Sequence, residues 1–165
     1  MKIPGLLLLI IAALFWSCSE KEKPQKMKAE EGAGQISPAE QAEKLIPKLQ
    51  ELQHAIQLDP QNTDLHKQLV TLSVDNDSNV ARAVGYGKPP KKAKSSAMAT
   101  QAAQQAAYVD ACRWLAYILQ WEQHPQQPAF GSITGKIPGA KIIHNTNADD
   151  QGTIVLVESK LSDYK

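Results

Sequence analysis

Between residues 37 and 74, the hydrophobic positions follow the spacing of two amphipathic helices. The first helix has the typical start of a capped helix, with Ser37 as the cap, Pro38 in the first turn and Glu40 three residues after the cap. Its apolar face recurs every three or four residues and comprises Ala42, Leu45, Ile46, Leu49, Leu52 and Ile56. Pro47 lies inside this pattern and should kink or split the helix, because proline lacks the amide hydrogen that a helix interior needs.

Residues 59–62 have the composition of a turn and should end the first helix. Leu65, Leu69 and Leu72 then return at helical spacing. Residues 70–74 alternate as in a strand, so the pattern leaves the end of this second helix open. We predict a helical hairpin over residues 37–74.

The strongest helix signal lies farther along the chain, after a short strand. Residues 79–84 alternate as a strand does, and Gly85, Gly87 and two prolines follow them. Residues 93–122 contain no glycine or proline and favour a long helix. Its first half has an apolar stripe of Met98, Ala102, Ala106 and Val109. Its second half is apolar almost all round, so we expect it to be buried against a sheet.

Two extended segments follow this helix. The first surrounds Pro138–Gly139 and contains Ile133, Lys136, Ile137, Ile142 and Ile143. Residues 145–150 have the composition of a polar turn, and residues 152–158 are rich in the β-branched residues typical of strands. The order strand, helix, strand, strand predicts an α+β fold over residues 75–162, with one long helix packed on a small sheet.

The first residues of the chain have the pattern of a bacterial export signal. Lys2 supplies a positive charge, and the uncharged run from Leu6 to Phe15 is too short to span a bilayer comfortably. Residues 14–18, Leu-Phe-Trp-Ser-Cys, resemble the lipobox of bacterial lipoproteins. This resemblance implies cleavage before Cys18, diacylglycerol on its thiol and acylation of the new amino terminus. The alternatives are an uncleaved membrane anchor and an ordinary secretory signal.

The lipobox resemblance sets the expected organisation of the N-terminal part and its location. We expect residues 1–17 to be a signal peptide and residues 18–36 to be a lipidated flexible tether, since residues 19–35 are rich in lysine and glutamate and almost free of apolar side chains. Two or more acyl chains hold a protein stably on a bilayer, so the lipid bilayer is the first expected partner. Ser19 stands where an aspartate would favour the inner membrane, which favours the periplasmic face of the outer membrane.

The charge balance excludes one class of partner. Cleavage after residue 17 removes one of the 18 basic groups and none of the 17 acids, so the mature chain has a net charge of zero. A neutral chain does not fit nucleic acid or broad electrostatic binding to a membrane. Residues 88–94 form a small basic patch, which we interpret as a solvated loop.

No arrangement of side chains in the sequence predicts catalysis, a metal site or a cofactor. The four histidines, His54, His66, His124 and His144, are scattered, and no cysteine pair accompanies them. With Cys18 lipidated, Cys112 is a lone thiol in an apolar stretch, and we expect it to be a buried, inert side chain. Asp110 and Arg113 are three residues apart on the long helix and can form a structural ion pair. We therefore predict that the chain is not an enzyme.

Residues 80–158 carry four motifs in a distinctive order. The first is Arg82-Ala83-Val84-Gly85-Tyr86-Gly87 and the second is Asp110-Ala111-Cys112-Arg113-Trp114-Leu115-Ala116. Residues 135–143, Gly-Lys-Ile-Pro-Gly-Ala-Lys-Ile-Ile, and residues 152–155, Gly-Thr-Ile-Val, complete the series. Together they resemble the family of the twenty-kilodalton membrane-antigen lipoprotein and the FlgP-type flagellar basal-disk lipoprotein.

The resemblance implies an outer-membrane lipoprotein without enzymatic activity. FlgP-like members form rings that support the flagellar motor. The family offers no catalytic residues to carry over, and it implies that Gly85, Gly87, Asp110 and Arg113 define the fold. Cys18 is then the single position at which a covalent modification is expected.

Three hypotheses for function remain open at this point. The first is a structural envelope protein that associates with itself or an envelope partner through a sheet edge or through a Trp114/Trp121 surface. The second is a monomeric periplasmic binding or adaptor module whose helical hairpin presents a groove. The third is a carrier with a lipid or ligand pocket under the apolar helix. A homo-oligomer would favour the first hypothesis and a stable monomer the second.

Overall fold

The computed structural model describes residues 38–93, 95–125, 137–148 and 152–164. The predicted signal peptide, Cys18 and the predicted tether lie outside the described residues, as do Ile133 and Lys136. Residues 36–165 belong to one compact unit. None of the helices in the described part combines the length and the apolar character needed to cross a bilayer.

The described residues form a mixed helical and antiparallel β structure, as the sequence predicts. Helices α1 (Pro38–Leu58) and α2 (Thr63–Ser73) precede strands β1 (Val74–Asp75) and β2 (Val80–Gly87), and the long helix α3 (Ser96–Gln123) follows. Strands β3 (Lys141–Asn147) and β4 (Thr153–Lys160) and a 3-10 turn (Leu161–Tyr164) complete the chain. The strand order is β1-β2-β4-β3, with every neighbouring pair antiparallel.

The predicted hairpin is present, but α1 is not split at Pro47. The helix continues through this residue, because the neighbouring Ile46 and Leu49 are 6% and 0% exposed and their burial holds both halves in the core. The structure also shows where α2 begins and ends. Asn62 caps its start by accepting hydrogen bonds from the Asp64 and Leu65 amides, and the chain passes directly from Ser73 into β1.

The contact between α3 and β2 is formed by small side chains. Ala103, Ala107 and Ala111 are fully buried on the helix face that meets Gly85 and Gly87. The predicted stripe is wrong, since Met98 and Val109 are 52% and 50% exposed. The helix approaches the strand too closely for large side chains, so size and hydrophobicity do not mark the buried face.

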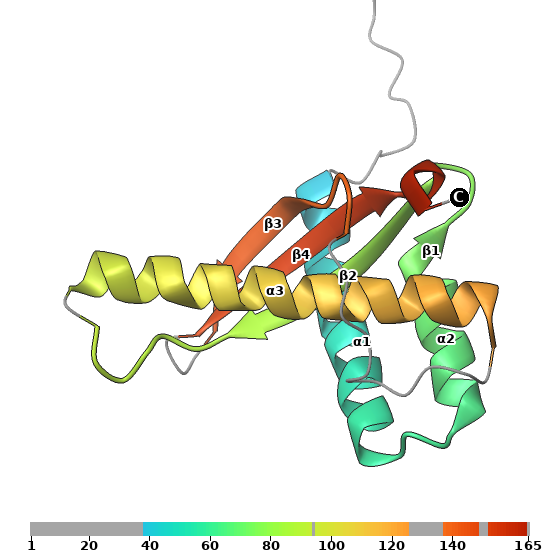
Figure 1. The fold of residues 1–165 in the computed structure, drawn as a ribbon, viewed down its shortest axis with the longest axis horizontal. Coiled ribbons are helices and arrows are strands. Elements are labelled where there is room, and N and C mark those ends of the chain that lie inside the picture. The colour runs from blue at the N-terminus through green and yellow to red at the C-terminus, as the bar shows by residue number, and fades with distance from the viewer. Residues whose placement is uncertain (1–37, 94, 126–136, 149–151, 165) are drawn as a thin grey trace, which may run out of the picture. The chain divides into compact units, whose positions relative to one another are not determined.

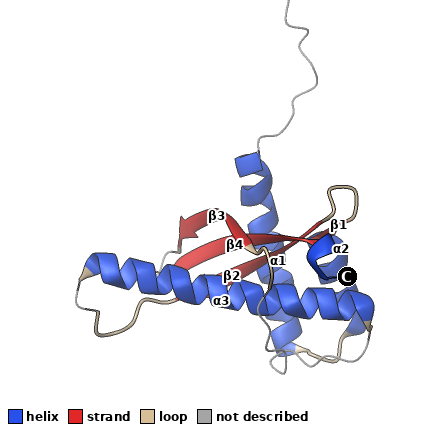
Figure 2. Cartoon of the chain, turned by 45° about the horizontal axis from the view of Figure 1, so that its top comes forward, coloured by secondary structure: helices blue, strands red, loops and turns tan. Residues whose placement is uncertain are grey.

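The sheet has a helix on each of its faces. Residues of β2 with the orientation of Gly85 point toward α3, so Val84 points to the opposite face, where it and its partner Leu156 are 1% exposed. Figures 1 and 2 show α3 passing in front of the strands and α1 passing behind them. The hairpin and the sheet therefore share one hydrophobic core, which includes Leu49, Val84 and Leu156.

The C-terminal half of α3 also packs on α2. Trp114, Tyr117 and Trp121 are 2%, 2% and 6% exposed and belong to the core of the protein. The expectation of a Trp114/Trp121 association surface is therefore wrong, because both indoles are already covered by their own chain.

The polar segment after Ile143 begins as a strand, not as a turn. Asn145, Thr146 and Asn147 pair with β4 opposite Val155, Ile154 and Thr153. A register shift between Ile142 and His144 leaves Ile143 as an extra residue. The turn prediction was wrong at its start because an edge strand exposed on both faces has no hydrophobic alternation to reveal it.

Candidate functional site

Side chains from both helices cover the free edge of β2. Strand β1 pairs only with Val80 and Ala81, so the edge from Arg82 onward has no neighbouring strand within the described residues. On α1, the Gln53 amide nitrogen donates to the Val84 carbonyl at 3.0 Å. On α3, the Asp110 carboxylate accepts the Tyr86 amide hydrogen at 3.1 Å. These two bonds satisfy backbone groups that would otherwise need a strand or water.

Asp110 is partly buried, accepts a backbone hydrogen bond and lies near a positive charge. Burial raises the pKa of the Asp110 carboxyl, while the Tyr86 hydrogen bond and the positive charge of Arg113 oppose that rise. Arg113, the predicted ion-pair partner, thus contributes a positive charge to the surroundings of this carboxyl. Tyr86, whose amide donates to Asp110, is 24 residues away along the chain, and no local pattern indicates this contact.

A shallow groove of about 460 Å³ runs along this covered edge. It is lined by polar side chains of α1, by three residues of β2 and by two residues of α3. The lining residues are Gln50, Gln53, His54, Gln57, Val84, Gly85, Tyr86, Asp110 and Trp114. The groove is open and rich in hydrogen-bonding amides, so its chemistry suits a polar chain such as an extended peptide.

The second edge of the sheet, on β3, is bare. Strand β3 pairs only with β4, and no described residue pairs with its outer side. Six of its seven residues are exposed, and His144 is half-buried. Ile142 and Ile143 are 36% and 41% exposed. An exposed edge of this kind is a template for pairing with another chain.

A row of charged side chains links the four strands of the sheet. Arg82 on β2 contacts Asp75 on β1 at 3.7 Å and Glu158 on β4 at 3.0 Å. Glu158 also contacts Lys141 on β3 at 3.2 Å. The row crosses all four strands, and Glu158 is only 14% exposed, so the central pairs are partly shielded from solvent. We call Asp75, Arg82, Glu158 and Lys141 the charge row.

The histidines differ in their burial. His66 is 4% exposed and stacks on Trp121 at 5.1 Å, whereas His54 and His124 are exposed and His144 lies on β3. Within the described ranges, no group of three or more histidine, cysteine, aspartate or glutamate side chains could hold a metal ion.

Cys112 is half-buried on α3. Burial raises the pKa of its thiol, and a hydrogen bond with Tyr108 opposes the rise. A thiol with a raised pKa is a poor nucleophile near neutral pH. Cys18, the predicted lipidation site, lies outside the described part of the chain.

No protein-family model matches the chain, and no curated protein sequence matches it. The resemblance to the outer-membrane lipoprotein family therefore remains a prediction from the quoted motifs.

Proposed function

We propose that this protein is a non-enzymatic, lipid-anchored envelope protein with a structural role, and that it assembles with further copies of itself through the outer edge of β3. The single observation that carries the assembly is that no described residue pairs with the outer side of β3. The lipid anchor rests on the lipobox pattern that ends at Cys18. The expected place of work is the periplasmic face of the outer membrane, and a flagellar basal-disk role is the more specific form of the proposal.

The geometry of β3 suits pairing with an identical strand. Residues 144–147 keep a regular register with β4, and their side chains, His, Asn, Thr and Asn, include no acid or lysine. Lys141 and the bulge at Ile143 lie at the other end of the strand, where they limit extended pairing. An antiparallel pair centred near residues 144–147 would be symmetric, as most homodimer contacts are.

The charge row supports the same role. It holds β3 against β4 at Lys141, beside the bulge, where backbone pairing is irregular. An edge strand that is already ordered loses less conformational freedom on pairing than a loose one does. The strand is therefore preorganised for pairing with a second strand.

We expect residues 19–165, purified without lipid, to form a discrete oligomer whose mass by light scattering rises with concentration. Ile143→Lys/Thr146→Lys places like charges across the paired edge and should weaken association by about ten-fold, since each such pair contributes up to about 1 kcal/mol. Gln68→Lys/Thr71→Lys adds the same charge to exposed positions of α2 and should leave the mass unchanged. A strict monomer at every concentration would contradict assembly through β3.

The anchor has its own test in bacterial cells. Labelled palmitate should appear on the full chain in the membrane fraction, and Cys18→Ser should abolish the label and leave the uncleaved precursor. Cys112→Ser is the matched control, because it removes the other thiol and should keep the label. Label on the Cys18→Ser variant, or its absence from the natural chain, would contradict lipidation at Cys18.

The second candidate function is a monomeric adaptor, and the groove along β2 favours it. An extended peptide that displaced Gln53 and Asp110 could pair with the freed Val84 and Tyr86 backbone groups. A strict monomer in the scattering experiment would shift the proposal to this groove. The third hypothesis, a ligand pocket under α3, loses support because glycine and alanine backbones fill the space between α3 and β2.

A further inference from the structure

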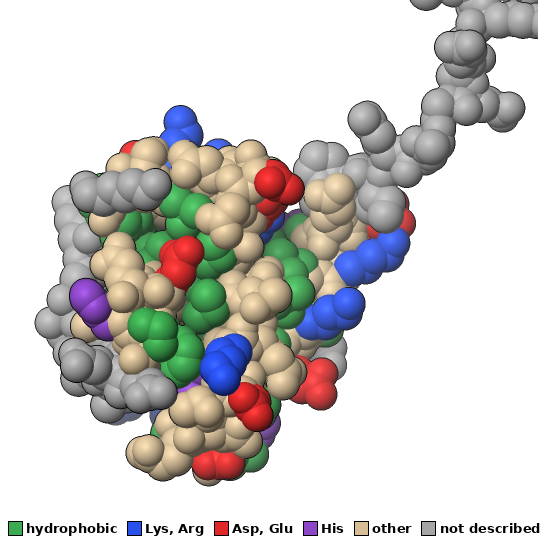
Figure 3. All heavy atoms as spheres, turned by 90° about the vertical axis from the view of Figure 1, so that its right-hand side faces the viewer, with side chains coloured by type: hydrophobic (Ala, Val, Ile, Leu, Met, Phe, Trp, Pro, Cys, Tyr) green, Lys and Arg blue, Asp and Glu red, His purple; other side chains and the backbone are tan. Residues whose placement is uncertain are grey.

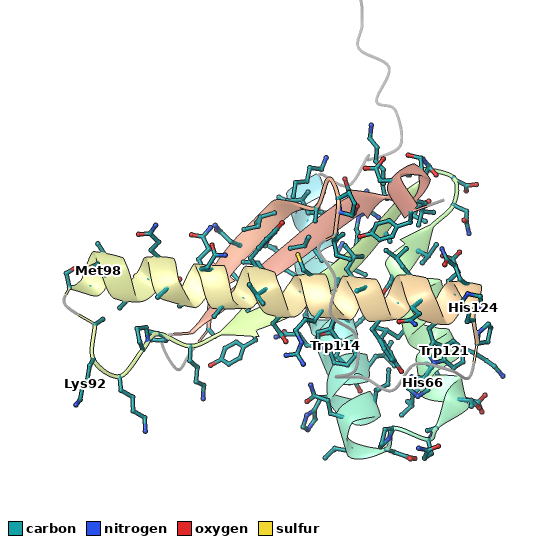
Figure 4. The ribbon with its side chains drawn as sticks, in the orientation of Figure 1. His66, Lys92, Met98, Trp114, Trp121 and His124 are labelled. Carbon is teal, nitrogen blue, oxygen red and sulfur yellow. The ribbon has the colours of Figure 1, made fainter. Side chains whose placement is uncertain are left out.

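The connection from β2 to α3 forms a cationic tip at one end of the molecule. Figure 1 shows the first turns of α3 extending beyond the strands, and Figure 4 shows Lys92 and Met98 at this same end. Lys88, Lys91 and Lys92 are exposed on the connection, and Met98 in the first turn of α3 is 52% exposed. We call these four residues the basic tip.

The lysines of the basic tip are not balanced by acids in their own segment. The chain has no aspartate or glutamate between Asp77 and Asp110. Lys91 and Lys92 take part in no ion pair within the described ranges, while Lys88 lies 5.7 Å from the centre of the Tyr86 ring. The first turn of α3 contains no acid either, so the positive end of the helix dipole adds to the same field.

The connection from β3 to β4 contains two acids, Asp149 and Asp150. It leads to Thr153, which pairs with Gly87, the residue before Lys88. Asp149, Asp150 and Lys94 lie outside the described residues. When Lys94 and the two aspartates are included in the count, the lysines still outnumber the acids. The opposite end of the molecule differs, since Figure 3 shows acidic and basic side chains intermixed there.

We propose that the basic tip docks on the anionic phospholipid surface of a membrane, with the lysines over the headgroups and Met98 at the headgroup boundary. Lysines contribute about 1 kcal/mol each near such a surface, and an adjacent apolar side chain adds burial. The neutral net charge of the mature chain excludes broad electrostatic binding but not a local contact of this kind.

This inference rests on the proposed lipid anchor. The anchor would keep the basic tip close to a membrane. Pro38 is twenty positions after Cys18, and an extended chain spans at most about 3.5 Å per position, or about 70 Å. The 28 residues of α3 are about 42 Å long at 1.5 Å per residue. The largest possible span of the chain between Cys18 and α1 is therefore greater than the length of α3.

The test uses the mature chain, residues 18–165 with Cys18→Ser, and vesicles of phosphatidylglycerol and phosphatidylethanolamine. The protein should sediment with these vesicles and not with vesicles of phosphatidylcholine. Lys91→Gln/Lys92→Gln should lower the partition coefficient by about thirty-fold, as two surface lysines predict. Lys48→Gln/Lys160→Gln, a matched pair of exposed lysines on α1 and β4, should change it by less than about two-fold.

Salt and an apolar substitution complete the experiment. Binding should fall steeply as salt rises to about 1 M, where the screening length is about 3 Å. Met98→Ser should weaken binding at every salt concentration. Equal binding to phosphatidylcholine, equal losses in the two lysine variants, or insensitivity to salt would overturn the proposal. Because this chain is unlipidated, failure here is distinct from failure of the palmitate labelling or of the oligomer mass.

Discussion

Gly85→Ala should lower the free energy of unfolding by about 3 kcal/mol or more and the melting temperature by about 10 °C. A Cβ atom on Gly85 would lie 2.8 Å from the Ala111 Cα and would also overlap the Ala107 carbonyl oxygen and the Ala111 amide nitrogen. These atoms belong to the backbone of α3, so no side chain can rotate away. The helix must move off the sheet, and thermal unfolding followed by circular dichroism measures the loss.

Gly139→Ala provides the comparison for this experiment. Gly139 has a φ of +65°, and its added Cβ would meet the Asp163 carboxylate at 2.6 Å. That neighbour is a movable side chain, so we expect a loss of only about 1–2 kcal/mol, mainly from the left-handed backbone. Equal melting temperatures for Gly85→Ala and the natural chain would show that the helix and the strand are farther apart than the structure places them.

His66→Ala should destabilise the protein by about 3 kcal/mol, through lost packing and a lost hydrogen bond. The Pro60 carbonyl can only accept, so the His66 Nε2, at 3.0 Å, carries the ring proton. The Nδ1 atom then accepts the Tyr117 hydroxyl proton at 2.5 Å. Tyr117 is 2% exposed, and burial raises the pKa of its hydroxyl to about 12. Urea unfolding of the two proteins measures the difference.

A double-mutant cycle separates the hydrogen bond from the packing. Tyr117→Phe removes the hydroxyl and keeps the ring, and its effect should couple to that of His66→Ala by about 1 kcal/mol or more. His54→Ala, an exposed histidine on α1, should change stability by less than about 0.5 kcal/mol. Strict additivity of His66→Ala and Tyr117→Phe would contradict the hydrogen bond between them.

Local periodicity predicts most elements of the fold but not the contacts between them. The hairpin, the long helix and the succession of helices and strands along the chain follow from spacing, because burial of one face sets the hydrophobic period of neighbouring residues. The order of the strands within the sheet, with β4 between β2 and β3, does not follow from spacing. The buried face of α3 has only a weak sequence pattern, because the same residue type, alanine, occupies both buried and solvent-exposed positions. A close approach to Gly85 and Gly87 decides which of them are buried, and that approach is a property of two distant segments.

Local sequence patterns also fail to predict side-chain contacts between distant segments, including those of the candidate site. Gln53 reaches Val84 across 31 residues, and His66 reaches Tyr117 across 51. Glutamine on a helix is usually a solvated side chain, so nothing in the sequence marks Gln53 as the cover of a strand edge. Asp110 was recognisable as a charged residue in an apolar stretch, but its partner on β2 was not.

The strand order also determines when this protein can fold during its synthesis. Strand β4 lies between β2 and β3, and its pairing joins residues as distant as Val80 and Lys160. The ribosome makes β4 after the three other described strands, so this sheet has no centre until Lys160 has been added. Such distant pairing is slow to form. Until β4 has emerged, β2 and β3 lack the strand that both of them pair with at the centre of this sheet.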